Sequence, residues 1–328
     1  MQATVEKKRG LRIDFQQVYR FSRLFVLILV IVFLTVLSPV FFTGNNAINV
    51  LRQASVATLL ALGMTAVILT GGIDLSIGAV LTLAGIAGAT VLKTGVWWPL
   101  GLLTGVALGV IAGIANGSMV AYIGLPPFVA TYGTMWIALG LAVVLMRGYI
   151  IYDFDQSFRF LGTGKILGMP TPVVLMAVFA VITWFVLKRT TIGRSIYAAG
   201  ANHEAARLSG INVKKTLVMA YTISGFFSGL GGMVFVARLN AAEAGLGESL
   251  LLPTIAAVAI GGTSMTGGVG SVVGTVIGVI IMTLIANGMN LLGVSSIWQS
   301  PVQGLVIVVA VLLDQWGRRA AERQEAGG

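Results

Sequence analysis

One acidic residue stands well apart from the long polar loops, and its setting allows two kinds of role. Asp74 occurs in the run Gly71-Gly72-Ile73-Asp74-Leu75-Ser76-Ile77-Gly78, between two apolar stretches. A carboxylate after paired glycines can cap the next helix, where the helix dipole favours negative charge. Ionisable residues enclosed by apolar segments otherwise mark pathways or gates. Both interpretations stay open for Asp74, and Ser76 joins it as a candidate pathway residue.

Side-chain amides form the rest of the candidate pathway. They lie inside or beside apolar stretches at Asn116, Asn287, Asn290, Gln299 and Gln303. An amide offers hydrogen-bond donors and acceptors without charge, which suits a neutral polyhydroxylated substrate. The alternative for each is a hydrogen bond between helices, which contributes about 0.6 to 2 kcal/mol.

Catalytic and cofactor motifs are missing from the sequence. It has no G-x-x-x-x-G-K-[ST] phosphate loop, no H-E-x-x-H or G-x-S-x-G motif, and no cysteine. The single histidine, His203, cannot form a multi-histidine metal site, and no chain of Asp, Glu or His crosses the apolar stretches to relay protons. We therefore expect no catalytic residue, no metal site and no bound cofactor. Any transporter that lacks both an ATP site and a proton relay needs an energy source on another subunit.

The basic loop 188–216 offers a place where a soluble partner that supplies this energy can dock. Asn202 can cap a short helix that has Glu204 in its first turn and Arg207 near its end. Gly200 and Gly210 frame this helix, and Gly210 can close it. We expect a compact helix that docks on a soluble partner, and the alternative is a solvated loop whose charges only set topology.

The composition is that of a membrane protein. Of 328 residues, 57% are hydrophobic and 10% are charged, against about 25% charged in soluble domains. Splitting the sequence at charges, prolines and glycine clusters predicts an all-α polytopic protein with about ten transmembrane helices. The expected spans are 24–42, 53–70, 73–92, 98–122, 127–146, 171–187, 217–238, 250–265, 270–287 and 298–314.

The charges predict an orientation. If the N-terminus is inside, both termini and loop 188–216 are cytoplasmic, and that side holds 15 of the 21 Lys and Arg residues. Cytoplasmic segments typically carry such an excess, so the net charge of +10 does not indicate nucleic-acid binding. We expect cytoplasmic tails at 1–23 and 315–328, a transmembrane domain at 24–314, and a main outer loop at 147–170.

Glycine marks both packing and interruptions. Glycines 101, 105, 109, 113 and 117 form one strip along a helix, where a neighbouring backbone can approach closely. Glycine and polar residues interrupt the apolar pattern at 71–78 and again at 261–270. Paired interruptions in a transporter point to its pathway, because irregular backbone needs protein or a water-filled cavity around it.

The chain resembles the permease subunits of bacterial ribose-type sugar importers driven by ATP-binding cassette subunits. The similar segments include the 71–78 run, T-V-L-S-P-V-F-F at 35–42, A-L-G-M-T at 61–65, A-A-R-L-S-G-I-N-V at 205–213, G-G-T-S at 261–264, and N-G-M-N-L-L-G-V-S-S at 287–296. The family's coupling segment falls on residues 200–212, whereas the outer segment 147–170 departs from the family pattern.

The resemblance implies a monosaccharide permease in the bacterial inner membrane and a set of partners. These are a second copy of the chain, a cytoplasmic ATPase with two nucleotide-binding halves that uses ATP and Mg, and a periplasmic or lipid-anchored sugar-binding protein. The other readings are an ion-coupled secondary transporter or a passive channel, which would need an ion or proton site, and an embedded enzyme, which would need a nucleophile and a base.

Overall fold

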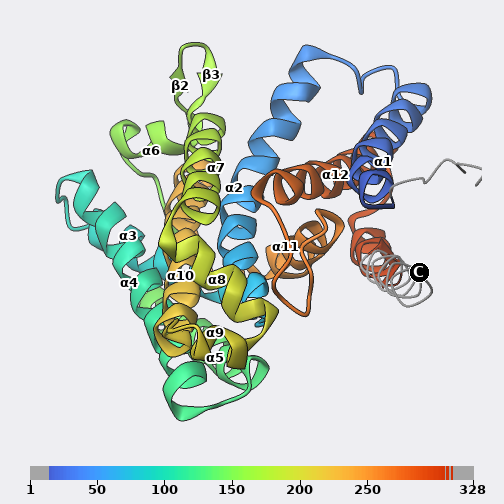
Figure 1. The fold of residues 1–328 in the computed structure, drawn as a ribbon. Coiled ribbons are helices and arrows are strands. Elements are labelled where there is room, and N and C mark those ends of the chain that lie inside the picture. The colour runs from blue at the N-terminus through green and yellow to red at the C-terminus, as the bar shows by residue number, and fades with distance from the viewer. Residues whose placement is uncertain (1–14, 307, 310–311, 313–328) are drawn as a thin grey trace, which may run out of the picture.

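The computed structural model describes residues 15–306, 308–309 and 312, and helices form nearly all of its regular structure (Figure 1). The long helices are α1 (Phe15–Leu37), α2 (Gly44–Leu69), α3 (Ile77–Leu92), α4 (Trp98–Ser118) with the π-helical turn η1 (Met119–Ile123), α5 (Pro127–Met146), α7 (Thr171–Arg189), α10 (Val213–Leu239), α11 (Glu248–Ile260) and α12 (Val272–Leu291). Shorter helices are α6 (Gln156–Thr163), α8 (Thr191–Ala201), α9 (His203–Leu208) and the 3₁₀ turn η2 (Ser296–Trp298).

Two small antiparallel ribbons accompany the helices. β1 (Ile151–Tyr152) pairs with β4 (Ala241–Ala242), and β2 (Lys165–Ile166) pairs with β3 (Met169–Pro170). The first ribbon ties the predicted outer loop to the end of α10. In the part of the chain that the structure describes, all other regular structure is helical.

Among the described residues, six helices are long and apolar enough to cross a membrane, namely α2, α4 with η1, α5, α7, α10 and α12. The part of α1 from Arg23, α3 and α11 are apolar but shorter. A further helix begins at residue 299, and the predicted tenth span 298–314 lies partly outside the described residues. The all-α polytopic architecture is confirmed, and the number of spans stays a prediction.

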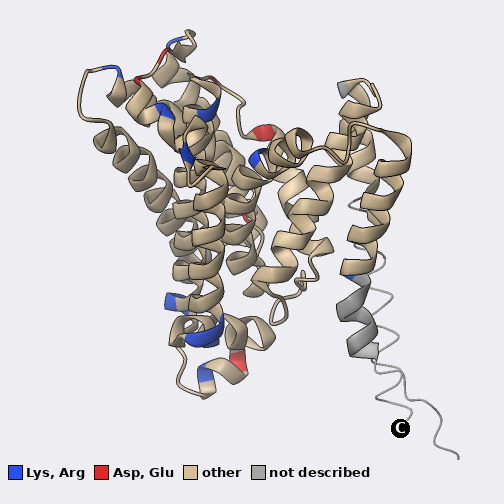
Figure 2. Cartoon of the chain, turned by 90° about the horizontal axis from the view of Figure 1, so that it is seen from above, with Lys and Arg blue, Asp and Glu red and all other residues tan. Residues whose placement is uncertain are grey.

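The distribution of charge fits a membrane protein. Figure 2 shows the charged residues gathered at two opposite ends of the helices, with an almost uncharged band between them. Large apolar side chains are exposed within that band, including Trp136, Ile137 and Val144 of α5. In water such exposure would be unfavourable, whereas lipid tails cover it at no cost.

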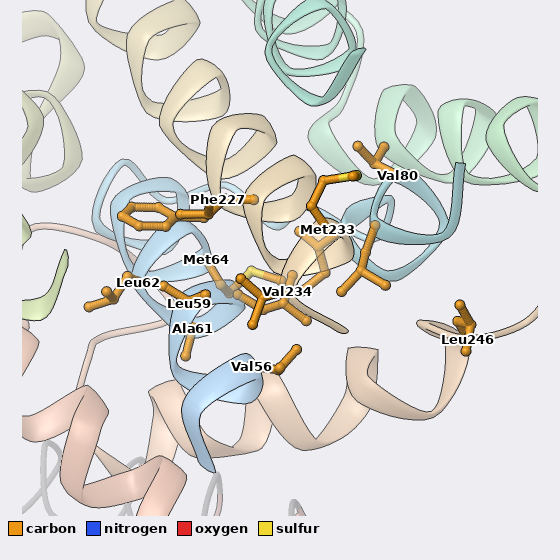
Figure 3. Close-up of a cluster of buried hydrophobic side chains, with 14 of the residues drawn as sticks. Val56, Leu59, Ala61, Leu62, Met64, Val80, Phe227, Met233, Val234 and Leu246 are labelled. Atoms are coloured by element: carbon orange, nitrogen blue, oxygen red, sulfur yellow. The ribbon is translucent and has the colours of Figure 1, made fainter. Parts of the chain in front are cut away.

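Helix α2 forms the centre of the protein. Every residue from Thr58 to Thr70 is buried, as expected of a helix that is apolar on all sides and surrounded by others. Figure 3 shows Val56, Leu59, Leu62 and Met64 of α2 beside Phe227, Met233 and Val234 of α10. This cluster holds the two helices that later contribute to the candidate site.

The predicted glycine strip of α4 is confirmed as a packing surface. A Cβ on Gly109 would meet the carbonyl oxygen of Gly225 and the backbone of Gly229, both on α10. A Cβ on Gly113 would meet the carbonyl oxygen of Tyr221. Backbone contact of this kind supplies the van der Waals packing that replaces hydrophobic association in lipid. It locks α10 against α4.

Several expected boundaries were wrong, and one helix was not predicted. Helix α1 ends at Leu37, because Pro39 cannot continue a helix, so the predicted span 24–42 was too long. Helix α2 begins at Gly44 instead of residue 53, since the Thr43 hydroxyl caps it by accepting from the Asn46 amide at 3.3 Å. The basic loop also contains the unpredicted helix α8.

The orientation of the helices is open to a direct test. The native chain has no cysteine, and Ser209 after α9 and Ser157 on α6 are both exposed. We expect Ser157→Cys to react with a membrane-impermeant thiol reagent in intact cells and Ser209→Cys to react only after the membrane is opened. Labelling of Ser209→Cys from outside would contradict a cytoplasmic basic loop.

Candidate functional site

A cavity of about 330 Å³ lies among α2, α10, α11, α12 and the helix that begins at residue 299. This volume is within the range of about 300–1,000 Å³ that is typical of small-molecule sites. Its polar lining residues are Gln53, Arg238, Ser249, Thr283, Asn290, Gln299 and Gln303. Its apolar lining includes Phe235, Leu250, Pro253, Ala257, Val279 and Met282. We call it the amide cavity.

Three of the predicted pathway residues meet in the amide cavity. Asn290 comes from the last turn of α12, whereas Gln299 and Gln303 lie one turn apart on the following helix. The Gln299 amide nitrogen donates to the Asn290 side-chain oxygen at 2.7 Å. Together these amides present donors and acceptors to the cavity beside an apolar wall. A neutral polyhydroxylated molecule matches that combination of surfaces.

Sequence reasoning missed Gln53 and Arg238. The early start of α2 places Gln53 inside the helix, not at its first residue, and Gln53 lines the cavity. Arg238 lies in the last turn of α10, and its guanidinium donates to the carbonyl oxygen of Arg52 at 3.0 Å. The expected spans 53–70 and 217–238 begin and end at these two residues, so both were treated as span ends and not as candidate pathway residues. A cap residue ahead of the apolar run, here Thr43, is the signal that would have moved the start of α2 to Gly44 and placed Gln53 inside the helix.

The amide cavity lies at one end of α2, and the basic loop lies at the other. Gln53 is in the third turn of α2, whereas Leu69 ends it beside α8. Sixteen residues of helix separate the two, or about 24 Å at 1.5 Å per residue. A substrate site and a docking helix at this separation require a mechanical connection if they are to act together.

Asn287 has a different partner. Its amide nitrogen donates to the Asn46 side-chain oxygen at 3.0 Å, and the Asn46 nitrogen donates back at 3.1 Å. Both side chains are buried. This reciprocal pair joins α12 to the first turn of α2, which is the helix-to-helix alternative raised for the amides. Asn287 is not among the residues that line the amide cavity.

Asp74, Ser76 and Asn116 form a separate buried cluster, which we call the Asp74 network. One Asp74 oxygen accepts from the Ser76 amide at 3.0 Å and the Ser76 hydroxyl at 2.6 Å. The other accepts from the Ser224 hydroxyl of α10 at 2.7 Å. The Asn116 amide of α4 donates to the Ser76 hydroxyl at 2.9 Å. The network therefore joins the start of α3 to α4 and α10.

The position of Asp74 differs from a simple helix cap. Helix α3 begins at Ile77, and Ser76 occupies the capping position without a side-chain capping bond. Asp74 lies two residues earlier and binds the backbone of Ser76. This arrangement shapes the entry to α3, and no residue of the Asp74 network lines the amide cavity. A pathway role for Asp74, Ser76 and Asn116 stays a prediction.

The predicted docking helix exists as α9. The Asn202 side chain accepts from the Ala205 amide at 2.9 Å, and Gly210 takes a positive φ of 83° just after the helix. Glu204 and Arg207 form an ion pair at 2.5 Å, and both are exposed. The hydrogen bond from Arg207 lowers the pKa of the Glu204 carboxyl, so the pair is charged at neutral pH. Helix α9 thus presents a charged, solvent-facing surface.

Gly200 belongs to a tighter environment than α9. A Cβ there would collide with the carbonyl oxygen of Leu69 at the end of α2 and with the amide of Gly268. The residue needs to be glycine because two other backbone segments occupy that space. Its predicted role in docking is untested, and its position connects the basic loop to the transmembrane helices.

Comparison with known proteins identifies the family. Residues 46–311 match the family described as "Branched-chain amino acid transport system / permease component". The chain belongs to this permease family. The matched region contains every residue of the amide cavity and of α9. No solved structure matches the chain.

The permease is similar to several curated sugar permeases. It is 42% identical over 302 residues to the ribose import permease protein RbsC of Bacillus subtilis (strain 168), covering 92% of this chain and 93% of that protein. It is 38% identical over 298 residues to the D-allose transport system permease protein AlsC of Escherichia coli (strain K12), covering 90% and 91%. It is 34% identical over 309 residues to the galactose/methyl galactoside import permease protein MglC of Haemophilus influenzae (strain ATCC 51907 / DSM 11121 / KW20 / Rd), covering 88% and 92%.

Within the described residues of the permease, no three His, Cys, Asp or Glu side chains lie close enough to hold a metal ion. The amide cavity offers hydrogen-bonding side chains, apolar side chains and the guanidinium of Arg238.

The Asp74 network predicts how the permease responds to substitution. Asp74→Asn keeps an acceptor for Ser76, and the Ser224 hydroxyl can turn to accept from the new amide. We expect it to unfold thermally in detergent close to the native temperature. Asp74→Leu should lower stability by several kcal/mol, because each buried donor left unsatisfied costs about 1–3 kcal/mol. Equal destabilisation by both changes would show that the charge itself is needed for folding.

Proposed function

We propose that this permease is the membrane-spanning subunit of an ATP-driven importer for a monosaccharide, a ribose-like pentose or a similar sugar. The amide cavity is the observation that carries the proposal. Its amides can bind hydroxyl groups, and the rings and methylenes of Phe235, Leu250 and Met282 can contact the apolar faces of a sugar. Asn290, Gln299 and Gln303 are the proposed pathway residues, and Gln53 and Arg238 join them.

The relatives support this choice of substrate class. Their names specify import or transport of ribose, D-allose and galactose or methyl galactoside, all of which are neutral sugars. An ion-coupled transporter or a passive channel is the alternative. It is less favoured because the polar residues of the amide cavity are uncharged apart from Arg238. Such a lining suits sugar hydroxyls better than a metal cation or a proton relay.

The energy source is placed on a partner. The permease is a transport subunit and not an enzyme, and a cytoplasmic ATPase with two nucleotide-binding halves consumes ATP and Mg on its behalf. A periplasmic or lipid-anchored binding protein delivers the sugar, a second copy completes the permease, and membrane lipid surrounds it. The complex resides in the bacterial cytoplasmic (inner) membrane and binds no nucleic acid.

Helix α9 is the proposed contact with the ATPase. Glu204 and Arg207 lie three residues apart on one exposed face, so they can touch the same partner surface. Asn202 and Gly210 set the two ends of this helix, and Gly200 holds the preceding turn against α2. Exposed ion pairs contribute little to folding, so both charged side chains are free to serve an interface.

Docking predicts a loss of coupling when these side chains are removed. We expect the double variant Glu204→Ala, Arg207→Ala to fold normally but to assemble poorly with the ATPase or to hydrolyse ATP without taking up sugar. Uptake and sugar-stimulated ATP hydrolysis are measured together in proteoliposomes that contain permease, ATPase and binding protein. A matched control is Arg194→Ala with Lys215→Ala, which removes two exposed charges from the same loop but outside α9.

Failure of the docking proposal and failure of the importer proposal give different results. Normal uptake at the normal ratio of ATP to sugar in the α9 variant would exclude Glu204 and Arg207 as docking residues. Accumulation of sugar against a gradient by the native permease without any ATPase would contradict the proposed importer as a whole.

A further inference from the structure

The two glycine-rich interruptions of the chain meet each other. The amide of Gly268 donates to the carbonyl oxygen of Leu69, the last residue of α2, at 2.9 Å. A Cβ on Gly267 would lie 2.8 Å from the amide nitrogen of Gly71. Residues 261–271, here called the glycine segment, therefore cap the C-terminal end of α2. The junction lies at the end of α2 that is remote from the amide cavity.

Helix α8 completes this junction from the side of the basic loop. The Tyr197 hydroxyl donates to the carbonyl oxygen of Gly270 at 2.9 Å. A Cβ on Gly268 would lie 2.8 Å from the Cα of Ala201, and Gly200 has no room for any side chain. The glycine segment is thus bonded to α8 and packed on it, and α9 follows α8 after the single residue Asn202.

The glycine segment is braced internally. The Ser264 amide donates to the Val269 carbonyl oxygen at 2.7 Å, and the Gly267 amide donates to the Ser264 carbonyl oxygen at 3.0 Å. The hydroxyls of Ser264 and Thr266 are hydrogen-bonded at 2.8 Å. A segment closed by its own hydrogen bonds moves as a unit, so a displacement at its Tyr197 end is passed to its other end.

The Gly261 end of the glycine segment lies close to the wall of the amide cavity. Helices α11 and α12 flank the glycine segment and cross where Gly261 faces the backbone of Gly274 and Gly278 faces that of Ala257. Ala257 and Val279, the neighbour of Gly278, both line the amide cavity. Because α11 and α12 touch backbone to backbone, with no side chains between them, they cannot shift far without moving each other. A shift of the glycine segment therefore moves the wall of the amide cavity.

A second route from α9 to the amide cavity runs along the chain itself through helix α10, and this helix is held more firmly than the glycine segment. Helix α10 follows α9 in the chain and reaches the cavity at Phe235 and Arg238. Between these points its backbone is locked along α4, where Gly109 and Gly113 contact Gly225 and Tyr221. The Asp74 network adds a further bond to α10 at Ser224. A rigid pair of helices transmits less relative movement than the glycine segment does.

We propose that the glycine segment, and not helix α10, carries movements of α8 and α9 to the wall of the amide cavity, with Tyr197 as the positioning residue that holds the segment to α8. The inference rests on the proposed function, since it assigns a route by which ATPase docking reaches the sugar. Coupling of this kind passes through contiguous contacts whose removal weakens it.

The permease offers a matched pair of tyrosines for the test. Tyr197→Phe removes the hydroxyl that binds Gly270, and Tyr221→Phe removes a buried hydroxyl that has no hydrogen-bond partner in the described part of the chain. Loss of one hydrogen bond corresponds to a change of about 2- to 10-fold in an equilibrium. We expect Tyr197→Phe to raise the ATP consumed per sugar by about that factor in proteoliposomes with ATPase and binding protein, while Tyr221→Phe leaves it unchanged.

Amide hydrogen exchange distinguishes a coupling role of Tyr197 from a purely structural one. In the native complex we expect ATP binding to the ATPase to change amide exchange in residues 261–271, and Tyr197→Phe to abolish that change. Unaltered coupling in Tyr197→Phe would overturn the inference. So would ATP-dependent exchange confined to α10 in the native complex, which decides the matter even if the variant folds poorly. A native complex that accumulates no sugar would instead contradict the proposed function.

Discussion

The carbonyl oxygen of Leu69 and the amide of Gly268 lie 2.9 Å apart, although nearly two hundred residues of chain separate them. Each belongs to a segment where regular helix stops, and such backbone groups need partners when lipid surrounds the protein. The two interruptions satisfy each other. That bond joins the end of α2 to the glycine segment, which is also bonded to α8 through Tyr197 and is flanked by the crossing helices α11 and α12. The glycine segment therefore lies between helices that line the amide cavity and helix α8, which α9 follows in the chain.

Glycine makes this junction possible at several points. Gly200 accepts the end of α2 at a distance that no side chain would allow, and Gly261 and Gly278 let α11 and α12 cross in direct backbone contact. The same device holds α10 against α4. The two contacts have different roles in our proposal. The long backbone contact between α4 and α10 holds these helices fixed, whereas the short glycine segment, which is closed by its own hydrogen bonds, moves as a unit. In this proposal, glycine contacts hold α4 and α10 as a fixed part of the permease, while the glycine segment with α11 and α12 moves when α8 and α9 move.

Local features were predictable from the sequence because they depend on a few neighbouring residues. Asn202, Glu204 and Gly210 indicated α9, and Pro127 and Pro172 fit the first turns of α5 and α7, whose starts agree with the expected spans. Three of the amides also proved to line one cavity. Gln53 and Arg238 were missed because they stand at the ends of the expected spans 53–70 and 217–238, where a polar residue is common, and only the structure shows that both line the cavity. The separation of Asp74 from the cavity and the meeting of the two interruptions depend on tertiary packing, which spacing along the chain does not reveal.

The central claim is that sugar passes through the amide cavity, and α2 provides a direct comparison. Gln53 lines that cavity, whereas Asn49, one turn earlier, lines a separate hollow with Lys165 and Pro170. The measurement is the initial rate of sugar uptake at subsaturating sugar in proteoliposomes for Gln53→Leu and Asn49→Leu, at equal permease content. We predict a fall of about 2- to 10-fold for Gln53→Leu, as expected from one lost hydrogen bond to the substrate, and native uptake for Asn49→Leu. Equal rates for the two variants would contradict passage of the sugar through this cavity.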